Sequence, residues 1–83
     1  MKILYFAWLR ERLDRGEEEI SPPAEVLTVR DLIAWLRRND EAADLAMQRP
    51  EIIKAAIDAK IVSHDTPIAG AKTIALFPPM TGG

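Results

Sequence analysis

The stretch from Lys2 to Trp8 is the feature that most limits what this chain can fold into. Both alternating sets of positions in it are apolar: Ile3, Tyr5 and Ala7, and Leu4, Phe6 and Trp8. A strand of this kind needs cover on both faces, as a strand inside a sheet has. The chain is therefore expected to build its fold around a sheet, with this strand in the middle.

Two short elements are expected next. The residues from Leu9 to Leu13 predict a helical turn that Gly16 ends, because glycine readily takes the left-handed conformation that closes a helix. Glu17 to Ile20 predicts a polar strand that returns beside the first. Its run of charge is interpreted as a solvated face that discourages pairing with other sheet edges.

A helix from Thr28 to about Arg38 is the strongest local prediction. Thr28 is a good cap for its first turn, and Asp31 stands three residues later. The apolar positions repeat at helical spacing, and they are Val29, Leu32, Ile33 and Leu36. One face of this helix is therefore expected to pack on the sheet.

A second short helix and three strands complete the pattern. Asp40 can cap a helix that reaches Met47 or Gln48, and Pro50 marks its end. The strands are expected at Ile52–Ile57 and Lys60–Val62, on either side of Asp58-Ala59, and at Thr73–Phe77 after the Gly70 turn. This order predicts an α+β fold, with a mixed sheet of four or five strands and its helices on one face.

Length and composition indicate one small domain. The chain has 83 residues, of which 48% are hydrophobic and 29% charged, too apolar for disorder and too short for two cores. We expect a domain at residues 1–77 and a flexible tail at residues 78–83. A core of this size leaves little room for an enclosed substrate cavity.

Charge and residue usage argue against several classes of function. A formal net charge of −2 predicts no nucleic-acid partner. Cysteine is absent and His64 is the single histidine, so no metal site, disulfide or thiol chemistry is expected and a reducing cytoplasm fits. The longest apolar run, Ile3–Leu9, is too short to cross a membrane, and it does not resemble a signal peptide.

The residues after Phe77 have a different character. Pro78 and Pro79 lack backbone donors, so they end the strand and direct the chain outward. Six residues from Pro78 onward span at most about 20 Å, and Gly82-Gly83 has no side chains to obstruct a narrow channel. A carboxylate on Gly83 is a poor electrophile, so it reacts only after activation, for instance as an acyl-adenylate. The alternative is a frayed end, against which the diproline and the preceding strand argue.

The tail Phe77-Pro78-Pro79-Met80-Thr81-Gly82-Gly83 resembles the ending Phe-Pro-Pro-Val-Thr-Gly-Gly of the small subunit of molybdopterin synthase, a ubiquitin-like β-grasp sulfur carrier. The resemblance continues through most of the chain, at Tyr5-Phe6-Ala7, Arg10-Glu11, Gly16, Val62-Ser63, Asp65 and Pro67-Ile68. Departures from the family pattern are Met80, Asp58 and the stretch Ala69-Gly70-Ala71-Lys72. None of these positions carries the chemistry.

The resemblance implies a function for Gly83. An ATP-using, E1-like enzyme would adenylate it, a sulfur donor would convert it to a thiocarboxylate, and the large synthase subunit would receive the tail in a two-plus-two complex. The sulfur would pass to cyclic pyranopterin monophosphate to form molybdopterin, in molybdenum cofactor biosynthesis. The chain itself would bind no cofactor, and the catalytic residues would belong to the large subunit. The tail residues expected to contact partners are Phe77, Pro78, Pro79, Met80, Thr81 and Gly82.

Three alternatives stay open. The chain could carry sulfur for the thiamine or another pathway, or it could be a protein modifier joined to lysines through Gly83. It could also be an interaction module with an inert tail. Among other conspicuous residues, Trp8 and Trp35 are interpreted as core or core edge, His64 as part of a solvated loop, and Phe77 as an exposed contact.

Overall fold

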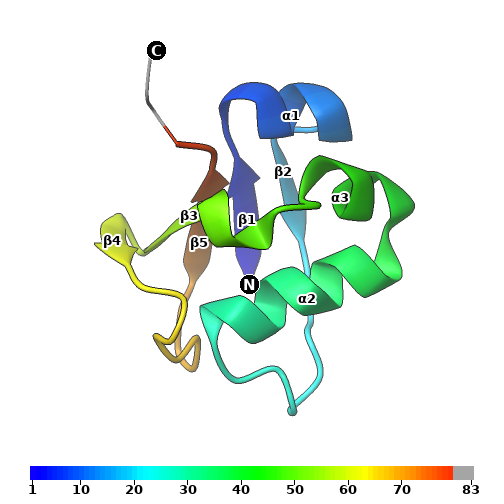
Figure 1. Ribbon diagram of the computed structural model, residues 1–83. Coiled ribbons are helices and arrows are strands. Elements are labelled where there is room, and N and C mark those ends of the chain that lie inside the picture. Colours follow the sequence, from blue (N-terminus) through cyan, green and yellow to red (C-terminus); the bar gives the residue numbers. More distant parts are fainter. Residues whose placement is uncertain (80–83) are drawn as a thin grey trace.

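The structure is a computed structural model in which residues 1–79 are described (Figure 1). The strands are β1 (Lys2–Tyr5), β2 (Glu17–Glu19), β3 (Lys54–Ile57), β4 (Lys60–Val62) and β5 (Thr73–Phe77). The helices are α1 (Ala7–Leu13), α2 (Val29–Asn39) and α3 (Glu41–Ala46), together with the 3₁₀ turn η1 (Pro50–Ile52). No helix in this part of the chain is both long and apolar enough to span a bilayer.

The five strands form one mixed sheet in the order β2-β1-β5-β3-β4. β1 and β5 are parallel, whereas the other neighbours are antiparallel. The last strand of the chain is therefore the central strand of the sheet, and it ends at the same edge as β1. The expected mixed sheet is confirmed, and β1 is an inner strand as predicted.

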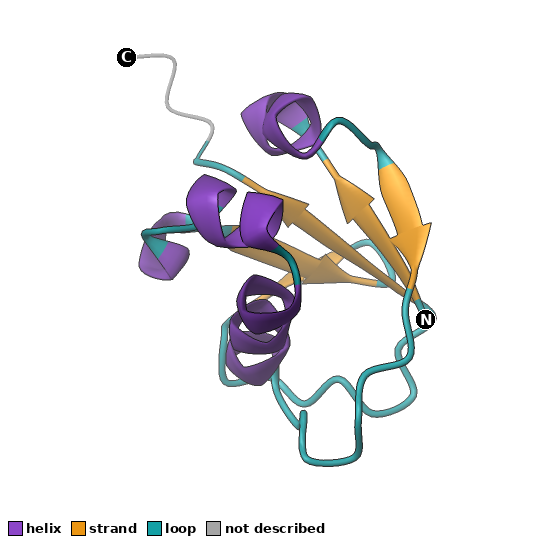
Figure 2. Cartoon of the chain, turned by 90° about the vertical axis from the view of Figure 1, so that its right-hand side faces the viewer, coloured by secondary structure: helices purple, strands orange, loops and turns teal. Residues whose placement is uncertain are grey.

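The helices lie on one side of the sheet, as predicted (Figure 2). Ile3 and Tyr5 of β1 and Ile74 and Leu76 of β5 point toward them and are buried. The helices contribute the apolar face of α2, two leucines of α1 and two alanines of α3 to the same core. Removal of this apolar surface from water is the main source of stability for so small a domain.

The predicted caps of α2 and α3 are both present. The side chain of Thr28 accepts a hydrogen bond from the Asp31 backbone N–H, and Asp31 in turn accepts one from the Thr28 N–H, at 3.2 Å each. Hydrogen bonds from the Leu27 backbone N–H, and to a smaller extent from that of Thr28, hold the pKa of Asp31 below its usual value. Asp40 caps α3 through the Ala42 N–H, at 2.9 Å.

The prediction that Lys2–Trp8 is one strand is wrong after Tyr5. The backbone N–H of Phe6 still donates to the Leu76 carbonyl of β5, at 3.2 Å. Ala7 then has a φ of 54°, which breaks the extended conformation and starts α1. The helix ends at Leu13, and the left-handed residue that caps it is Asp14, with a φ of 55°, and not Gly16 as expected.

Other boundaries differ by one or two residues. β2 stops at Glu19, before Ile20, and α3 ends at Ala46. Only Lys54–Ile57 of the predicted strand Ile52–Ile57 belongs to β3, because the 3₁₀ turn that Pro50 opens includes Ile52. Proline suits a first turn since it has no N–H to leave unpaired.

The hairpin around Asp58-Ala59 is confirmed. Both turn residues have positive φ, 46° and 76°, as a two-residue hairpin turn requires. Asp58 also accepts hydrogen bonds from the backbone N–H groups of Lys72 and Thr73, at 3.2 and 3.0 Å. Asp58 therefore fastens the hairpin to the start of β5.

Candidate functional site

The described part of the tail, Pro78 and Pro79, directly follows the end of the central strand β5 (Figure 1). Phe77, the last residue of β5, is paired with Lys54 of β3. On the β1 side of β5, the last register pair is Tyr5 with Leu76, and the Phe6 N–H donates to the Leu76 carbonyl. Phe6 therefore lies beside Phe77. Phe6 is 46% exposed and Phe77 is half-buried. Two aromatic residues and one lysine therefore surround the base of the tail.

The two prolines differ in their surroundings. β5 ends at Phe77, as predicted from the proline that follows it. Pro78 is fully buried and so packs within the body of the domain, although the sequence places the start of the tail there. Pro79 is half-buried. The predicted site residues Met80, Thr81, Gly82 and Gly83 lie outside the described residues.

An apolar row crosses the face of the sheet that carries no helices. The register pairs Leu4 with Ala75, Ala75 with Ala56, and Ala56 with Ile61, so the row spans β1, β5, β3 and β4. Ile61, at the β4 end of this row, is 77% exposed. Phe77 lies on the same face, two residues after Ala75. We call Leu4, Ala56, Ile61, Ala75 and Phe77 the open-face patch.

Charged side chains flank the open-face patch. On β2, Glu17 faces Leu4 across the sheet and forms an ion pair with Lys2, with the two charged groups 3.4 Å apart. Beside the tail, Lys54 is exposed and forms no ion pair with another described residue. The acidic edge strand is solvated at Glu17 and Glu19, as predicted.

Sequence reasoning missed the open-face patch. The apolar residues on both faces of the first strand predicted cover on both sides, yet only the side of Ile3 and Tyr5 is covered by helices. No local signal identifies the patch, because Ile61 lies between the charged Lys60 and the apolar Val62, and single exposed apolar side chains are common on protein surfaces.

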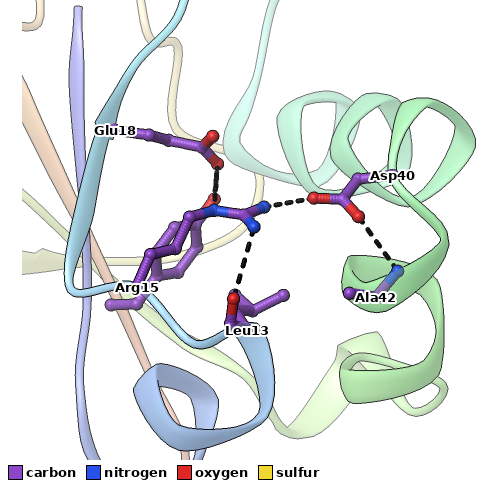
Figure 3. A network of polar contacts seen from close by, with 6 residues as sticks. Leu13, Arg15, Glu18, Asp40 and Ala42 are labelled. Carbon is purple, nitrogen blue, oxygen red and sulfur yellow. Dashed lines mark hydrogen bonds and ion pairs between the residues drawn. The ribbon is translucent and has the colours of Figure 1, made fainter.

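The other side of the sheet holds a polar network around Arg15 that the sequence did not reveal (Figure 3). The Arg15 guanidinium forms ion pairs with Glu18 of β2, at 3.4 Å, and with Asp40 at the junction of α2 and α3. It also donates to the Leu13 carbonyl at the end of α1, at 3.3 Å. Tyr5 of β1 donates its hydroxyl proton to Glu18. The Arg15 side chain thereby ties the outer strand β2 to the end of α1 and to the junction of α2 and α3.

The network changes the acidity of its members. The hydrogen bond from Arg15 holds the pKa of the Asp40 carboxyl below its ordinary value, and the Ala42 N–H adds to this effect. Burial is the main cause that raises the pKa of Tyr5, followed by its hydrogen bond to Glu18. Burial alone would lower the pKa of Arg15, but its acidic partners raise it. Arg15 and Asp40 are therefore both charged at neutral pH. Arg15 also holds the end of α1 through the Leu13 carbonyl, and this helix begins next to the tail.

The remaining predicted residues have structural roles. Trp8 and Trp35 are half-buried and pack against the core, as predicted. His64 is not simply solvated, because its Nε2 lies 2.6 Å from the Ile53 carbonyl oxygen in a half-buried position. Its loop is joined to α2 by a backbone hydrogen bond from Arg30 to the His64 carbonyl, at 2.9 Å.

Comparisons with known proteins agree with this architecture. The molybdopterin synthase sulfur carrier subunit of Escherichia coli is 31% identical over 83 residues, which cover 100% of this chain and 99% of that protein. The crystal structure of SAMP1 from Haloferax volcanii superposes with a TM-score of 0.73 at 22% identity, covering 100% and 98% of the two chains.

A Pyrococcus furiosus protein assigned as molybdopterin converting factor, subunit 1, superposes with a TM-score of 0.68 at 28% identity, over 94% of each chain. These neighbours share the ubiquitin-like β-grasp, so the predicted fold class is confirmed. The profile of the ThiS family matches residues 3–83. The chain therefore belongs to the ThiS family.

Proposed function

We propose that this protein is a sulfur carrier that acts as the small subunit of molybdopterin synthase. The observation that carries the proposal is the position of the tail base, at the end of the central strand and beside the open-face patch. A partner that docks on this patch would hold Phe77 while the residues beyond Pro79 reach its active site. The full-length match to a carrier subunit of that enzyme supports the pathway.

In this proposal the reacting group is the carboxylate of Gly83. The carboxylate attacks the α-phosphorus of ATP bound to an E1-like activating enzyme, forming the acyl-adenylate and releasing pyrophosphate. Sulfur from a donor then displaces AMP and leaves a thiocarboxylate. The thiocarboxylate sulfur attacks a carbon of cyclic pyranopterin monophosphate, where a C–O bond breaks and the oxygen group leaves with a proton. Water then hydrolyses the resulting thioester, which leaves the sulfur on the product and regenerates the Gly83 carboxylate. The carrier is therefore recycled, and it needs no cofactor of its own.

The described residues supply docking and reach in this scheme. The open-face patch gives an apolar contact of the kind that protein interfaces use at their centre. Lys54 adds one positive charge beside Phe77, which favours an acidic region on the partner. The large subunit would supply the catalytic groups, and a two-plus-two assembly would contain two such docking sites.

Intact mass of the protein isolated from its native host tests the proposal. We expect a fraction of the chain in which one terminal oxygen is replaced by sulfur, together with a co-purifying large subunit. The shift should disappear when Gly83 is deleted, whereas the Lys72→Glu variant should keep it. A chain that is never sulfurated under conditions of active cofactor synthesis would contradict the proposal.

The same experiment separates the competing functions. A sulfurated chain that co-purifies with no large synthase subunit would favour the thiamine or another sulfur pathway. Lysine-linked adducts through Gly83 would favour a protein modifier. The segment Phe77-Pro78-Pro79 favours the molybdopterin pathway among these.

A further inference from the structure

A shallow groove lies on the helical side of the sheet, away from the open-face patch. It has a volume of about 210 Å³ and is formed by α1, α3 and the segment that leads into η1. The residues that line it are Trp8, Arg12, Leu45, Ala46, Gln48, Arg49 and Ile52. We call this the helical groove.

The orientation of α3 indicates that the groove is more than incidental surface. The buried face of this helix consists of alanines, Ala43 and Ala46, while its large apolar residue, Leu45, is 62% exposed. A helix that only covered the core would place leucine inside and alanine outside. Leu45 is therefore available to an apolar group from another molecule.

Two arginines flank this apolar floor. The Arg12 guanidinium lies over the Trp8 ring, 4.4 Å from its centre, which orients both side chains. Arg12 has no ion pair with another described residue. Arg49 pairs with Glu51 at 3.3 Å, but both side chains are largely exposed, so this pair is easily exchanged for another carboxylate.

The charge of the groove is opposite to that of the whole chain. None of the described residues that line it is acidic, although the chain has a formal net charge of −2. Planar guanidinium groups bind carboxylates in a bidentate manner. Carboxylates placed on either side of an apolar side chain would complement Arg12, Leu45 and Arg49 together.

We infer that the helical groove is a second docking surface, which binds an acidic segment with apolar side chains in a partner protein. The groove begins at Trp8, in the first turn of α1, and Phe6 beside the tail directly precedes that helix. A protein that receives the tail can therefore reach this groove around the same end of the sheet. The concave shape favours a peptide over a membrane surface, which would need a broad convex apolar face.

A short acetylated and amidated peptide of alternating glutamate and leucine tests this inference. Titration into the isotopically labelled chain should give saturable NMR shifts at the Trp8 indole N–H, Arg12 and Leu45. A peptide with lysine in place of glutamate, or serine in place of leucine, should bind at least several-fold more weakly.

Matched variants locate the binding. Arg12→Gln combined with Arg49→Gln should raise Kd roughly fivefold to tenfold, and Leu45→Ser should raise it roughly fivefold. Arg38→Gln and Leu27→Ser serve as controls, because Arg38 is exposed outside the groove and Leu27 is 63% exposed at another site. Both controls should bind like the wild type, and spectra of the free variants confirm that each is folded.

Three results would overturn the inference. They are the absence of saturable shifts, equal binding of the lysine peptide, and shifts centred on the open-face patch. Sedimentation with phosphatidylserine vesicles that depends on Leu45 would assign the groove to a membrane surface instead. None of these results bears on sulfur transfer by Gly83, so this inference and the proposed function fail separately.

Discussion

Lys54 of β3 lies directly opposite Phe77 of β5 in the antiparallel register, so its exposed side chain stands beside the base of the tail. Opposite positions of a strand pair have neighbouring side chains on the same face. In the proposed function, this positive charge lies where the partner approaches to receive the tail.

Reversing this charge should weaken partner binding. We expect Lys54→Glu to lower the affinity for the large subunit on the order of tenfold at low salt, mainly through slower association, with a smaller effect at high salt. Lys72→Glu is the matched control, since Lys72 is also exposed but precedes the opposite end of β5. Surface plasmon resonance at two salt concentrations measures both rates, and equal behaviour of the two variants would refute the role of Lys54.

The open-face patch should matter for binding and little for folding. Ile61→Thr keeps a β-branched residue in β4, and Ile61 is 77% exposed, so the free energy of unfolding should change by less than about 0.5 kcal/mol. The affinity for the large subunit should fall roughly fivefold to tenfold, because apolar contact area is lost. Leu27→Thr, at an exposed apolar residue elsewhere on the surface, should leave the affinity unchanged. An unaltered affinity in Ile61→Thr would place the interface elsewhere.

Local rules were enough to predict α2 and the hairpin. Thr28 and Asp31 interact within one helical turn, and Asp58 and Ala59 set their own turn, so neighbouring residues decide these structures. At the start of α1, Phe6 is still bonded to Leu76 from the opposite end of the chain, and Ala7, with its positive φ, then begins the helix. A short apolar run is compatible with either a strand or a helix when its contacts with distant parts of the chain are unknown.

The same distinction applies to the candidate site. The tail motif from Phe77 onward is a continuous segment, so its character was readable in the sequence. The open-face patch and the Arg15 network combine residues from several strands and helices. Their parts are ordinary residues when taken singly, and only the sheet order brings them together.

Replacing Ala59 by glycine should stabilise the protein. Ala59 has a φ of 76°, where an L-residue is strained by about 1–2 kcal/mol and glycine is not. Part of this gain is offset by the flexibility of glycine in the unfolded chain, so we expect a net increase of about 0.5–1 kcal/mol in unfolding free energy. Urea denaturation measures it. Ala24→Gly, at an exposed turn residue without positive φ, should destabilise, and a destabilised Ala59→Gly would contradict the turn geometry.

The Arg15–Asp40 pair should make stability depend on pH in the acid range. The pKa of Asp40 is lowered in the folded state, so its stabilising contribution is fully present above the ordinary value of 3.8 and is lost as pH falls through the folded value. Asp40→Asn keeps the cap on α3 but removes the charge. We expect it to be less stable than the wild type by about 1 kcal/mol at neutral pH, and equally stable in strong acid.

Urea denaturation across this pH range tests the coupling. Asp65→Asn is the control, because the Arg30–Asp65 pair is largely exposed and should contribute little at any pH. A difference between Asp40→Asn and the wild type that stays constant down to the most acidic pH would show that the charge of Asp40 does not contribute.

Tyr5 should resist ionisation in alkali. It is the single tyrosine of the chain, so the absorbance of phenolate reports on this residue alone. Burial and the hydrogen bond to Glu18 raise its pKa, and therefore no phenolate should form near pH 10, where free tyrosine titrates. The linkage has a definite sign: the stabilising contribution of the neutral phenol is complete below about pH 10 and is lost as pH rises above it. Tryptophan fluorescence, recorded together with the absorbance, should show unfolding at the same pH at which phenolate appears. Phenolate formation near pH 10 with unchanged fluorescence would mean that Tyr5 is accessible to solvent and that the Arg15 network is not closed around it.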